Sequence, residues 1–316
     1  FRWVYDVTDY KPLFHDTVEI AAGNQQELID LKFVMIKGTP PRDILNTEQI
    51  WVGNWQHADI ANNAVLPSID YQLNPTASQF RIKTRTSGHW FGGFQNCAEF
   101  CPKNHNIYVD GVKRFEWLNW KPCASNPVIA QGGTWIYDRA GWCPGAFTDT
   151  YDHELTPFVT SGSTVSLNYG METTAGGMEG NYWVSMQLIS YGAANFNLDA
   201  AIDEIISPNS WEFRSKINPI CADPKIIIQN TGSTTLTSLT ITYNVLGGTP
   251  EIYNWSGSLD FLEKEEVTLP ILSQTFWNTM ATTNVFEVSI SSPNGGADGY
   301  TNNNYAKSTF TKPAVY

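Results

Sequence analysis

The stretch SQFRIKTRTSG, residues 78–88, alternates apolar and polar side chains and ends at a glycine. Successive side chains of a β-strand point to opposite faces of a sheet, so this alternation is typical of a strand with one buried face. Similar alternation, bounded by Gly, Asn, Pro or Ser, recurs in LKFVMIKG (31–38), HNIYVDGV (105–112) and NYWVSMQLISYG (181–192). The only stretch that resembles a helix is DAAIDEII (199–206). We therefore expect an all-β protein.

The chain divides into three segments by composition. Residues 1–42 hold two expected strands and end in the paired prolines of GTPPRD (38–43), which suit a linker. Two strands cannot bury a core alone, so this segment is expected to close a larger sandwich or to pack on its neighbour. Residues 43–206 are rich in Trp and Cys. Residues 207–316 are rich in Thr, Ser and Asn, with turn signals about 8–12 residues apart, which predicts a seven-stranded Ig-like or fibronectin-like sandwich.

The composition argues against several classes of partner. The 316 residues carry a net charge of −12, so they repel phosphates, and we expect no nucleic-acid partner. Only 16% of residues are charged whereas 13% are aromatic, including 12 Trp, which suits a secreted, glycan-facing β protein. No apolar run is long enough to span a membrane. Because the chain opens without Met, we interpret it as mature or trimmed, with any export signal removed.

Five cysteines are present, and four of them lie between positions 97 and 143. This clustering favours a local disulfide framework and an oxidising compartment, that is, an extracellular, cell-surface or periplasmic location. The alternative is a zinc site, but a C-x3-C pair followed by two widely spaced cysteines fits no compact zinc pattern. The five scattered histidines include no H-x-H pair, so copper is not expected, and we predict no metal or cofactor. Cys221 is left over, as a buried thiol or the partner of a missing segment.

Three separated motifs resemble the C-terminal domain of the peptide-N-glycosidase F family: RTSGHWFGGFQNCAEFC (85–101), PCASNPVIAQGGTWIYDRAGWCPG (122–145) and NYWVSMQLISYG (181–192). In that family Cys-Ala-Glu-Trp-Cys, Cys-Ser-Ala-Asn-Pro and Asp-Arg-Ala-Gly-Trp-Cys-Pro-Gly stretches occur in this order and at similar spacing. DVTDYKPLF (6–14) and LKFVMIKGTP (31–40) look like the closing strands of the family's N-terminal domain. The strand NTGSTTLTSLTITY (230–243) resembles the Ig-like modules of Bacteroidetes surface proteins.

This resemblance implies a fold and a pairing of cysteines. The family is built from two side-by-side jelly-roll-like sandwiches, so residues 1–42 would close the first, incomplete one and residues 43–206 would form the second. The implied disulfides are Cys97–Cys101 and Cys123–Cys143.

The resemblance also implies a ligand and a reaction. The ligand would be the chitobiose core of an Asn-linked glycan, and the reaction would be hydrolysis of the Asn side-chain amide, with Glu99 as the acid that the Cys-flanked loop contributes. The family's other acids belong to its N-terminal domain, and TVEIAAGNQQ (17–26) lacks its Thr-Glu-Thr-Trp stretch. We therefore expect a non-catalytic module that binds glycan or protein. The alternatives are an amidase with its remaining acids upstream and a structural part of a surface assembly.

The candidate binding residues each have a plainer interpretation. Glu99 faces a sugar or amide, or it is a loop carboxylate held by backbone N–H groups or by Arg139. Arg139 contacts a glycan, or it forms a structural ion pair with Asp138. Trp142 packs on the neighbouring disulfide or offers an aromatic platform for a sugar. His89 and Trp90 lie in the Gly-flanked stretch SGHWFGG (87–93), where an exposed aromatic is permitted and a His is most often a hydrogen-bonded loop residue. The expected partners are an N-linked glycan or glycoprotein and the proteins of a surface assembly.

Overall fold

The computed structural model describes residues 2–21, 23, 30–126, 133–173, 178–218, 222–273, 275–277 and 283–311. The chain forms two compact units, each built on β-strands. One unit comprises Trp3–Ala21 and Ile44–Ala193, and the other comprises Ala194–Tyr316 with Phe1–Arg2 and Ala22–Asp43. Among the described residues no helix is long and apolar enough to cross a membrane. The predicted all-β fold is confirmed.

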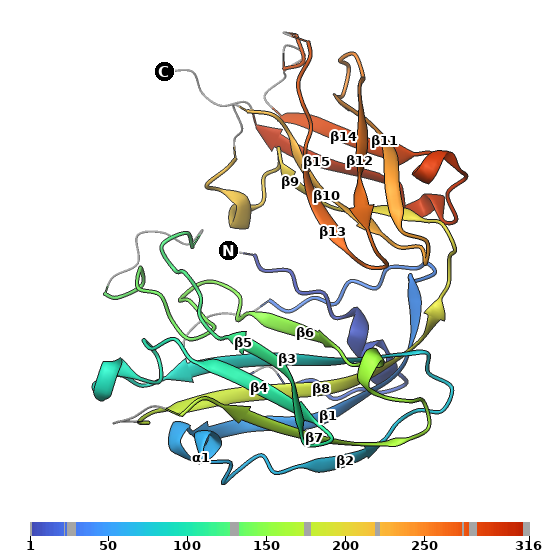
Figure 1. Ribbon diagram of the computed structural model, residues 1–316. Helices are drawn as coiled ribbons and strands as arrows, with labels where there is room; N and C mark the ends of the chain where they lie inside the picture. Colours follow the sequence, from blue (N-terminus) through green and yellow to red (C-terminus); the bar gives the residue numbers. More distant parts are fainter. Residues whose placement is uncertain are drawn as a thin grey trace. The chain divides into compact units, whose positions relative to one another are not determined.

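The unit around residues 44–193, called the first sandwich below, contains two antiparallel four-stranded sheets (Figure 1). The first sheet has the order β1-β8-β3-β6 and the second has the order β2-β7-β4-β5. A short helix, α1 (His57–Ala61), follows β1. The strands of the two sheets are β1 (Arg42–Gln56), β8 (Asn181–Ala194), β3 (Gln79–His89), β6 (Thr150–Glu154), β2 (Ile69–Gln72), β7 (Thr164–Met171), β4 (Asn104–Val109) and β5 (Val112–Leu118).

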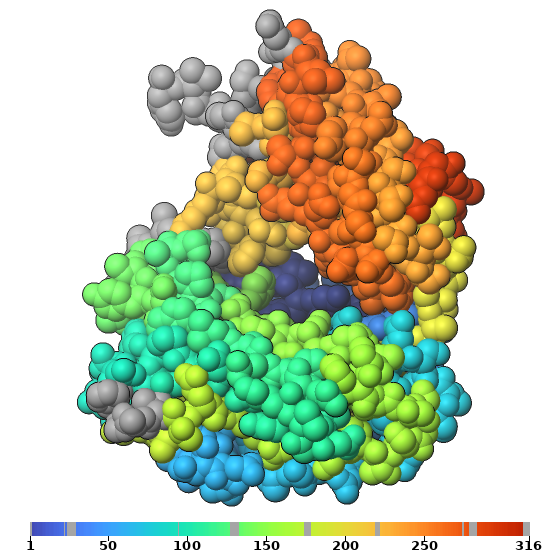
Figure 2. Space-filling model, in the orientation of Figure 1, coloured from blue at the N-terminus to red at the C-terminus, as the bar shows by residue number. Residues whose placement is uncertain are grey.

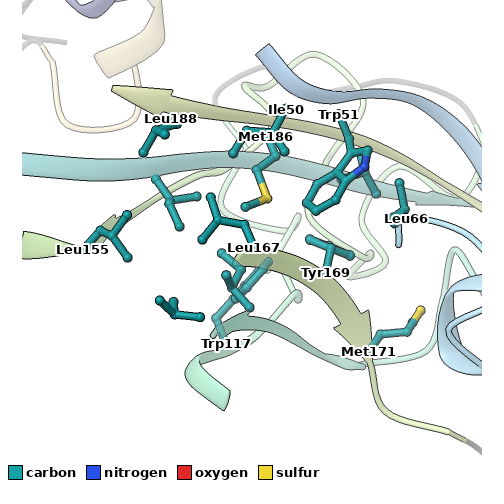
Figure 3. Packing of buried hydrophobic residues seen from close by; sticks show 14 of the residues in the cluster. Ile50, Trp51, Leu66, Trp117, Leu155, Leu167, Tyr169, Met171, Met186 and Leu188 are labelled. Carbon is teal, nitrogen blue, oxygen red and sulfur yellow. The ribbon is translucent and has the colours of Figure 1, made fainter. Parts of the chain in front are cut away.

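The core of the first sandwich lies between its two sheets. Trp51 on β1 and Met186 on β8 point toward Leu167 and Tyr169 on β7 of the opposite sheet (Figure 3). All four side chains are buried, and burial of each apolar side chain contributes about 1.5–3 kcal/mol of transfer free energy. The alternation read in residues 78–88 is the alternation of β3, where Phe80 faces this core.

A two-residue turn joins β4 and β5. Asp110 and Gly111 have φ of 50° and 76°, which is the positive-φ pair that a type I′ hairpin turn requires. The Asp110 carboxylate also accepts the backbone N–H of Ser166 at 2.9 Å, so the hairpin is fastened to β7.

The unit around residues 194–316, called the second sandwich below, contains a three-stranded sheet of order β13-β10-β9 and a four-stranded sheet of order β12-β11-β14-β15. Ile226, Ile228 and Val267 of the smaller sheet share a buried cluster with Ile241 and Phe286 of the larger one. In Figure 2 the side chains of β11–β13, in orange, cover the visible face of this sandwich. Its strands are β9 (Ala200–Ser207), β10 (Lys225–Asn230), β11 (Leu236–Val245), β12 (Glu251–Leu259), β13 (Lys264–Thr268), β14 (Thr283–Ser291) and β15 (Tyr305–Thr311). The three-plus-four arrangement fits the expected seven-stranded sandwich, and its Ig-like kinship stays a prediction.

The helix expected at residues 199–206 is wrong, because these residues form strand β9. Ile205 lies opposite Ile226 and Ile202 opposite Ile228 on β10, so β9 gains its hydrogen bonds and its burial from the neighbouring strand. Helix propensity is a weak preference even for alanine, its strongest former, and pairing with a buried strand outweighs it. The segment boundary expected at 206/207 therefore falls at the end of a strand of the second sandwich, and the compact units divide at 193/194 instead.

The strand expected at residues 31–38 is also not formed. No strand pairs with this stretch among the described residues, and Val34, Met35 and Ile36 are 81%, 69% and 90% exposed. An extended run without a hydrogen-bonded neighbour does not make a strand. That residues 1–42 close another jelly-roll-like sandwich, distinct from the two described above, stays a prediction.

Residues 3–21 pack against the first sandwich, with a 3₁₀ turn at Thr8–Leu13. The Asp9 carboxylate lies 2.9 Å from the Lys83 ammonium and accepts the Tyr191 hydroxyl at 2.8 Å. The backbone oxygen of Asp9 accepts the Thr47 hydroxyl at 2.5 Å. Asp9 thus ties this segment to β1, β3 and β8.

Candidate functional site

Two disulfides hold the loops that carry the predicted site residues. Cys97–Cys101 closes a loop between β3 and β4, and Cys123–Cys143 closes the longer connection between β5 and β6. Both pairs are those that the sequence resemblance implied. All four cysteines are buried. Disulfides of this kind indicate an oxidising compartment. Cys221 lies outside the described residues.

Backbone hydrogen bonds join the two disulfide loops to the end of β3. The Glu99 N–H donates to the Trp90 carbonyl at 3.0 Å, and the Ala140 N–H donates to the Glu99 carbonyl at 2.9 Å. The Gly88 N–H in turn donates to the Ala140 carbonyl at 2.9 Å. All five predicted site residues therefore come together, although they span positions 89 to 142 of the sequence.

Gly88 permits this close approach. A Cβ atom at Gly88 would lie 2.4 Å from the Ala98 carbonyl oxygen and 2.8 Å from the Ala140 Cβ. Such distances are shorter than any real contact, so only glycine allows the two loops to meet at the end of β3.

The centre of the site is an ion pair between Glu99 and Arg139. The Arg139 Nε donates to Glu99 Oε1 at 2.9 Å, and the two side chains are 3% and 14% exposed. The remaining guanidinium N–H groups donate to the Tyr137 carbonyl at 2.7 Å, to the Thr134 carbonyl at 2.9 Å and to the Thr134 hydroxyl at 3.0 Å. Arg139 is therefore fully engaged by protein acceptors and fixes the position of the Glu99 carboxylate.

Aromatic rings enclose the guanidinium of Arg139. Its central carbon lies 4.8 Å from the centre of the Phe100 ring and 5.2 Å from the centre of the Trp142 ring. These distances are within the range of cation–π attraction, which is stronger for a desolvated cation. The predicted pair between Arg139 and Asp138 is not what the described residues show, because the Asp138 carboxylate accepts the Cys123 N–H at 3.0 Å and Arg139 pairs with Glu99.

Trp142 and His89 are packed into the loops. The Trp142 Nε1 donates to the Gly88 carbonyl at 2.8 Å, and its ring stacks on His89 with centres 5.2 Å apart. His89 Nε2 lies 2.9 Å from the Ser87 hydroxyl. Burial lowers the pKa of His89, so this imidazole is neutral at pH 7. His89 thus makes the hydrogen bond of its plainer interpretation, whereas the Trp142 ring packs on His89 and Arg139.

Trp90 and Phe91 are exposed aromatics of the Gly-flanked stretch, with 56% and 65% of their surface accessible, and Tyr137 of the longer disulfide loop is 57% exposed. Trp90 has φ of 98°, a backbone conformation that costs a non-glycine residue free energy and that is enriched at functional sites. The Phe91 ring packs edge-on against Phe100, with centres 6.3 Å apart. Sequence reasoning missed Phe91 and Phe100, although they flank Trp90 and Glu99 directly.

One carboxylate oxygen at the site accepts no hydrogen bond from the described residues. Glu99 Oε1 is bound by Arg139, whereas Glu99 Oε2 has no hydrogen-bond partner among the described residues. The arrangement offers a fixed acceptor beside exposed rings, which suits a hydroxyl-bearing ligand. Within the described part of the chain no group of three or more His, Cys, Asp or Glu side chains is placed to hold a metal ion.

Comparison with known proteins points to one family. Residues 56–189 match the family model described as "Peptide-N-glycosidase F, C terminal". The chain is 25% identical over 214 residues to peptide-N(4)-(N-acetyl-β-D-glucosaminyl)asparagine amidase F of Elizabethkingia miricola, an alignment that covers 62% of this chain. The chain spans 60% of the length of that curated relative.

Two solved structures of relatives are also similar to part of this chain. PNGase F, a glycosylasparaginase from Flavobacterium meningosepticum, is 25% identical and has a TM-score of 0.44, with 50% of this chain and 55% of that chain covered. A second solved structure of a peptide-N(4)-(N-acetyl-β-D-glucosaminyl)asparagine amidase is 26% identical and has a TM-score of 0.42, with the same coverage. The match over residues 56–189 includes both disulfide loops and the Glu99–Arg139 pair. The chain is peptide-N-glycosidase F-like, and the likeness to the family's C-terminal domain lies in residues 56–189 of the first sandwich.

Proposed function

We propose that the loop face formed by Trp90, Phe91 and Glu99 binds the core of an Asn-linked glycan, and that this chain is a non-catalytic binding module of a secreted or cell-surface protein. The observation that carries the proposal is the free Oε2 of an immobilised carboxylate beside two exposed aromatic rings. Sugar hydroxyls donate to such an oxygen, and the apolar face of a pyranose packs on an exposed ring.

The same geometry argues against catalysis by these residues alone. Hydrolysis of an amide needs a base to activate water, an acid for the leaving amine and donors for the oxyanion. Arg139 has its N–H groups directed to protein acceptors, and the Trp142 N–H is bonded to Gly88. Glu99 keeps a carboxylate oxygen without a hydrogen-bond partner among the described residues, and this oxygen can accept from a ligand.

Titration of the full chain with a glycopeptide that carries the chitobiose core tests the binding proposal. Trp90→Ala with Phe91→Ala removes the exposed rings, and we expect affinity to fall at least tenfold. Tyr305→Ala is the matched control, because Tyr305 is 50% exposed and lies on β15 of the second sandwich. Equal affinity of the Trp90/Phe91 double variant and the wild type would refute binding at this face.

The second candidate is the amidase activity named for the relative. Its support is the same free oxygen of Glu99, which could orient a substrate or a water molecule if further acids reside elsewhere in the parent protein. Mass spectrometry of a denatured glycoprotein after incubation would show release of the glycan and conversion of Asn to Asp. Release that is abolished by Glu99→Gln would establish the amidase and overturn the non-catalytic proposal.

A third candidate is a structural part of a surface assembly. Exposed apolar side chains of Val34, Met35 and Ile36 favour it, since patches of this kind mark contacts with other proteins. Loss of assembly after replacement of these three residues by Ser, with glycan binding unchanged, would support this role.

A further inference from the structure

A recess of about 400 Å³ lies in the second sandwich, and none of the site residues predicted from the sequence lines it. Its walls include Lys307, Ser308 and Thr309 of β15, the turn at Ser210 and Trp211, and Arg2. The volume is within the range of about 300–1,000 Å³ that small-molecule sites occupy. Nothing in the comparisons assigns a function to it.

The charge of the recess differs from that of the chain. The sequence has 31 acidic and 19 basic residues, yet the lining contains two cations and no carboxylate. Neither Arg2 nor Lys307 belongs to an ion pair formed between described residues. Glu287 lies opposite Lys307 in the sheet register, but its carboxylate accepts the Tyr305 hydroxyl at 2.6 Å. The recess therefore offers positive charge without an internal counterion, which favours an anionic ligand.

Trp211 is the aromatic residue of the lining, and hydrogen bonds hold it in place. Trp211 Nε1 donates to the Arg2 carbonyl at 3.0 Å, and the Trp211 backbone N–H donates to the Asn209 side-chain oxygen at 2.9 Å. Asn209 is buried and donates to the carbonyls of Ile205 and Ile206 on β9, at 2.8 and 2.6 Å. The Trp211 ring packs on Phe213, with centres 5.1 Å apart, and the indole contributes apolar surface to the lining of the recess.

Hydroxyl groups complete the lining. Ser308 Oγ donates to the Pro208 carbonyl at 2.5 Å, so its oxygen keeps acceptor capacity. Ser210 and Thr309 hydroxyls lie 3.5 Å apart, at the limit of a hydrogen bond, and are available to bond a ligand instead. Cations, an aromatic face and short hydroxyl side chains are the three groups that recognise a charged sugar.

We propose that this recess binds a monosaccharide unit that bears a carboxylate. Arg2 and Lys307 hold the carboxylate, the Trp211 ring packs on the apolar face of the pyranose, and Ser210 and Thr309 bond ring hydroxyls. This site is separate from the loop face of the first sandwich and does not depend on the function proposed there.

Galacturonic acid and galactose test the proposal, because they differ only in a carboxylate in place of the C6 hydroxymethyl group. Calorimetric or saturation-transfer titration of the full chain is expected to show binding of galacturonic acid and at least tenfold weaker binding of galactose. Lys307→Gln and Trp211→Ala should each lower the affinity for galacturonic acid at least tenfold. Lys225→Gln is the matched control, because Lys225 is a cation of the same sandwich paired at the surface with Glu266.

Three results would overturn the proposal. The first is affinity for galacturonic acid unchanged by both Lys307→Gln and Arg2→Gln. The second is equal affinity for galactose, which would remove the role of the carboxylate. The third is equal affinity for acetate and galacturonic acid, which would show that the recess binds anions without recognising the sugar. Trp90→Ala should not alter galacturonic acid binding, so the outcome is independent of the loop face.

Discussion

Glu99 and Arg139 form a 2.9 Å ion pair in which the arginine side chain is only 3% exposed. The pair lies between the two disulfide loops, and the same guanidinium also bonds Tyr137 and Thr134. One side chain thus connects the Cys97–Cys101 loop to the Cys123–Cys143 loop and also braces the latter from within.

Arg139→Ala is expected to lower the free energy of unfolding of the first sandwich by about 3–5 kcal/mol, because it leaves the Glu99 carboxylate partly buried without its partner. Urea unfolding followed by tryptophan fluorescence measures the change. Arg114→Ala is the control, since Arg114 is exposed and contacts only the Phe158 ring among the described residues, a contact that contributes at most about 1 kcal/mol. Equal effects of the two substitutions would contradict a structural role for the pair.

Asp9→Asn is expected to detach residues 3–16 from the first sandwich. The substitution removes the charge that faces Lys83 at 2.9 Å, and a hydrogen bond to a charged group contributes about 1.5–3 kcal/mol. Hydrogen exchange with mass spectrometry should show faster exchange in residues 3–16. Asp6→Asn serves for comparison, because Asp6 is exposed and bonds only the N–H of Thr8 within the described chain. Unchanged exchange in the Asp9 variant would show that other contacts hold this segment.

The first sandwich should lose stability in acid through its buried histidines. Burial lowers the pKa of His105 to about 3 and that of His153 to about 4, and it also lowers the pKa of His57. The unfolded chain, with ordinary histidine values near 6.5, binds more protons than the folded one below that pH. Stability is therefore complete above pH 6.5 and falls by about 1.4 kcal/mol per pH unit for each histidine as the pH drops toward the folded value.

His153→Gln isolates one of these contributions. Glutamine can keep the hydrogen bond that His153 Nε2 makes with the Thr84 hydroxyl at 3.2 Å, and it does not titrate. The slope of unfolding free energy against pH between 6 and 4.5 is expected to fall by about 1.4 kcal/mol per pH unit. A slope equal to that of the wild type would show that His153 is not buried as a neutral group.

The two disulfides should contribute unequally to stability. In the chain-entropy model the cost of removal grows with loop length, and the cysteines are 4 residues apart in one bridge and 20 in the other. Replacing Cys123 and Cys143 by Ala should cost about 3 kcal/mol, and replacing Cys97 and Cys101 about 2 kcal/mol. Thermal unfolding of both double variants gives the comparison. A larger loss for the shorter loop would show that native contacts, and not unfolded-chain entropy, dominate.

Alternation of side chains was sufficient to predict most of the fold. Phe80, Ile82 and Thr84 recur at every second position of β3 and are all buried, as a sandwich strand requires. The helix predicted for residues 199–206 was wrong because Ala, Asp and Glu are compatible with either helix or strand, and only pairing with β10 decides between them. The strand predicted for residues 31–38 was wrong for the converse reason, since an alternating sequence forms no strand without a hydrogen-bonded partner strand.

The cysteine pairings were predicted from the resemblance to a known family, whereas the contacts of the two loops could not be predicted. Glu99 held by Arg139 was one of two interpretations, and the sequence contains nothing that orients a side chain across the 40 positions between them. The packing of Phe100 on Arg139 depends on the loop conformation for the same reason.

The assignment of β9 to the second sandwich determines where that sandwich can be separated from the rest of the chain. β10 lies between β9 and β13, so a fragment that began at residue 207 would turn β10 into an open edge. Its backbone N–H and C=O groups would then be free to capture strands from other molecules, and Ile226 and Ile228 would lose part of their cover. A fragment that begins at Ala194 keeps this edge capped, and it is the one expected to remain monomeric in solution.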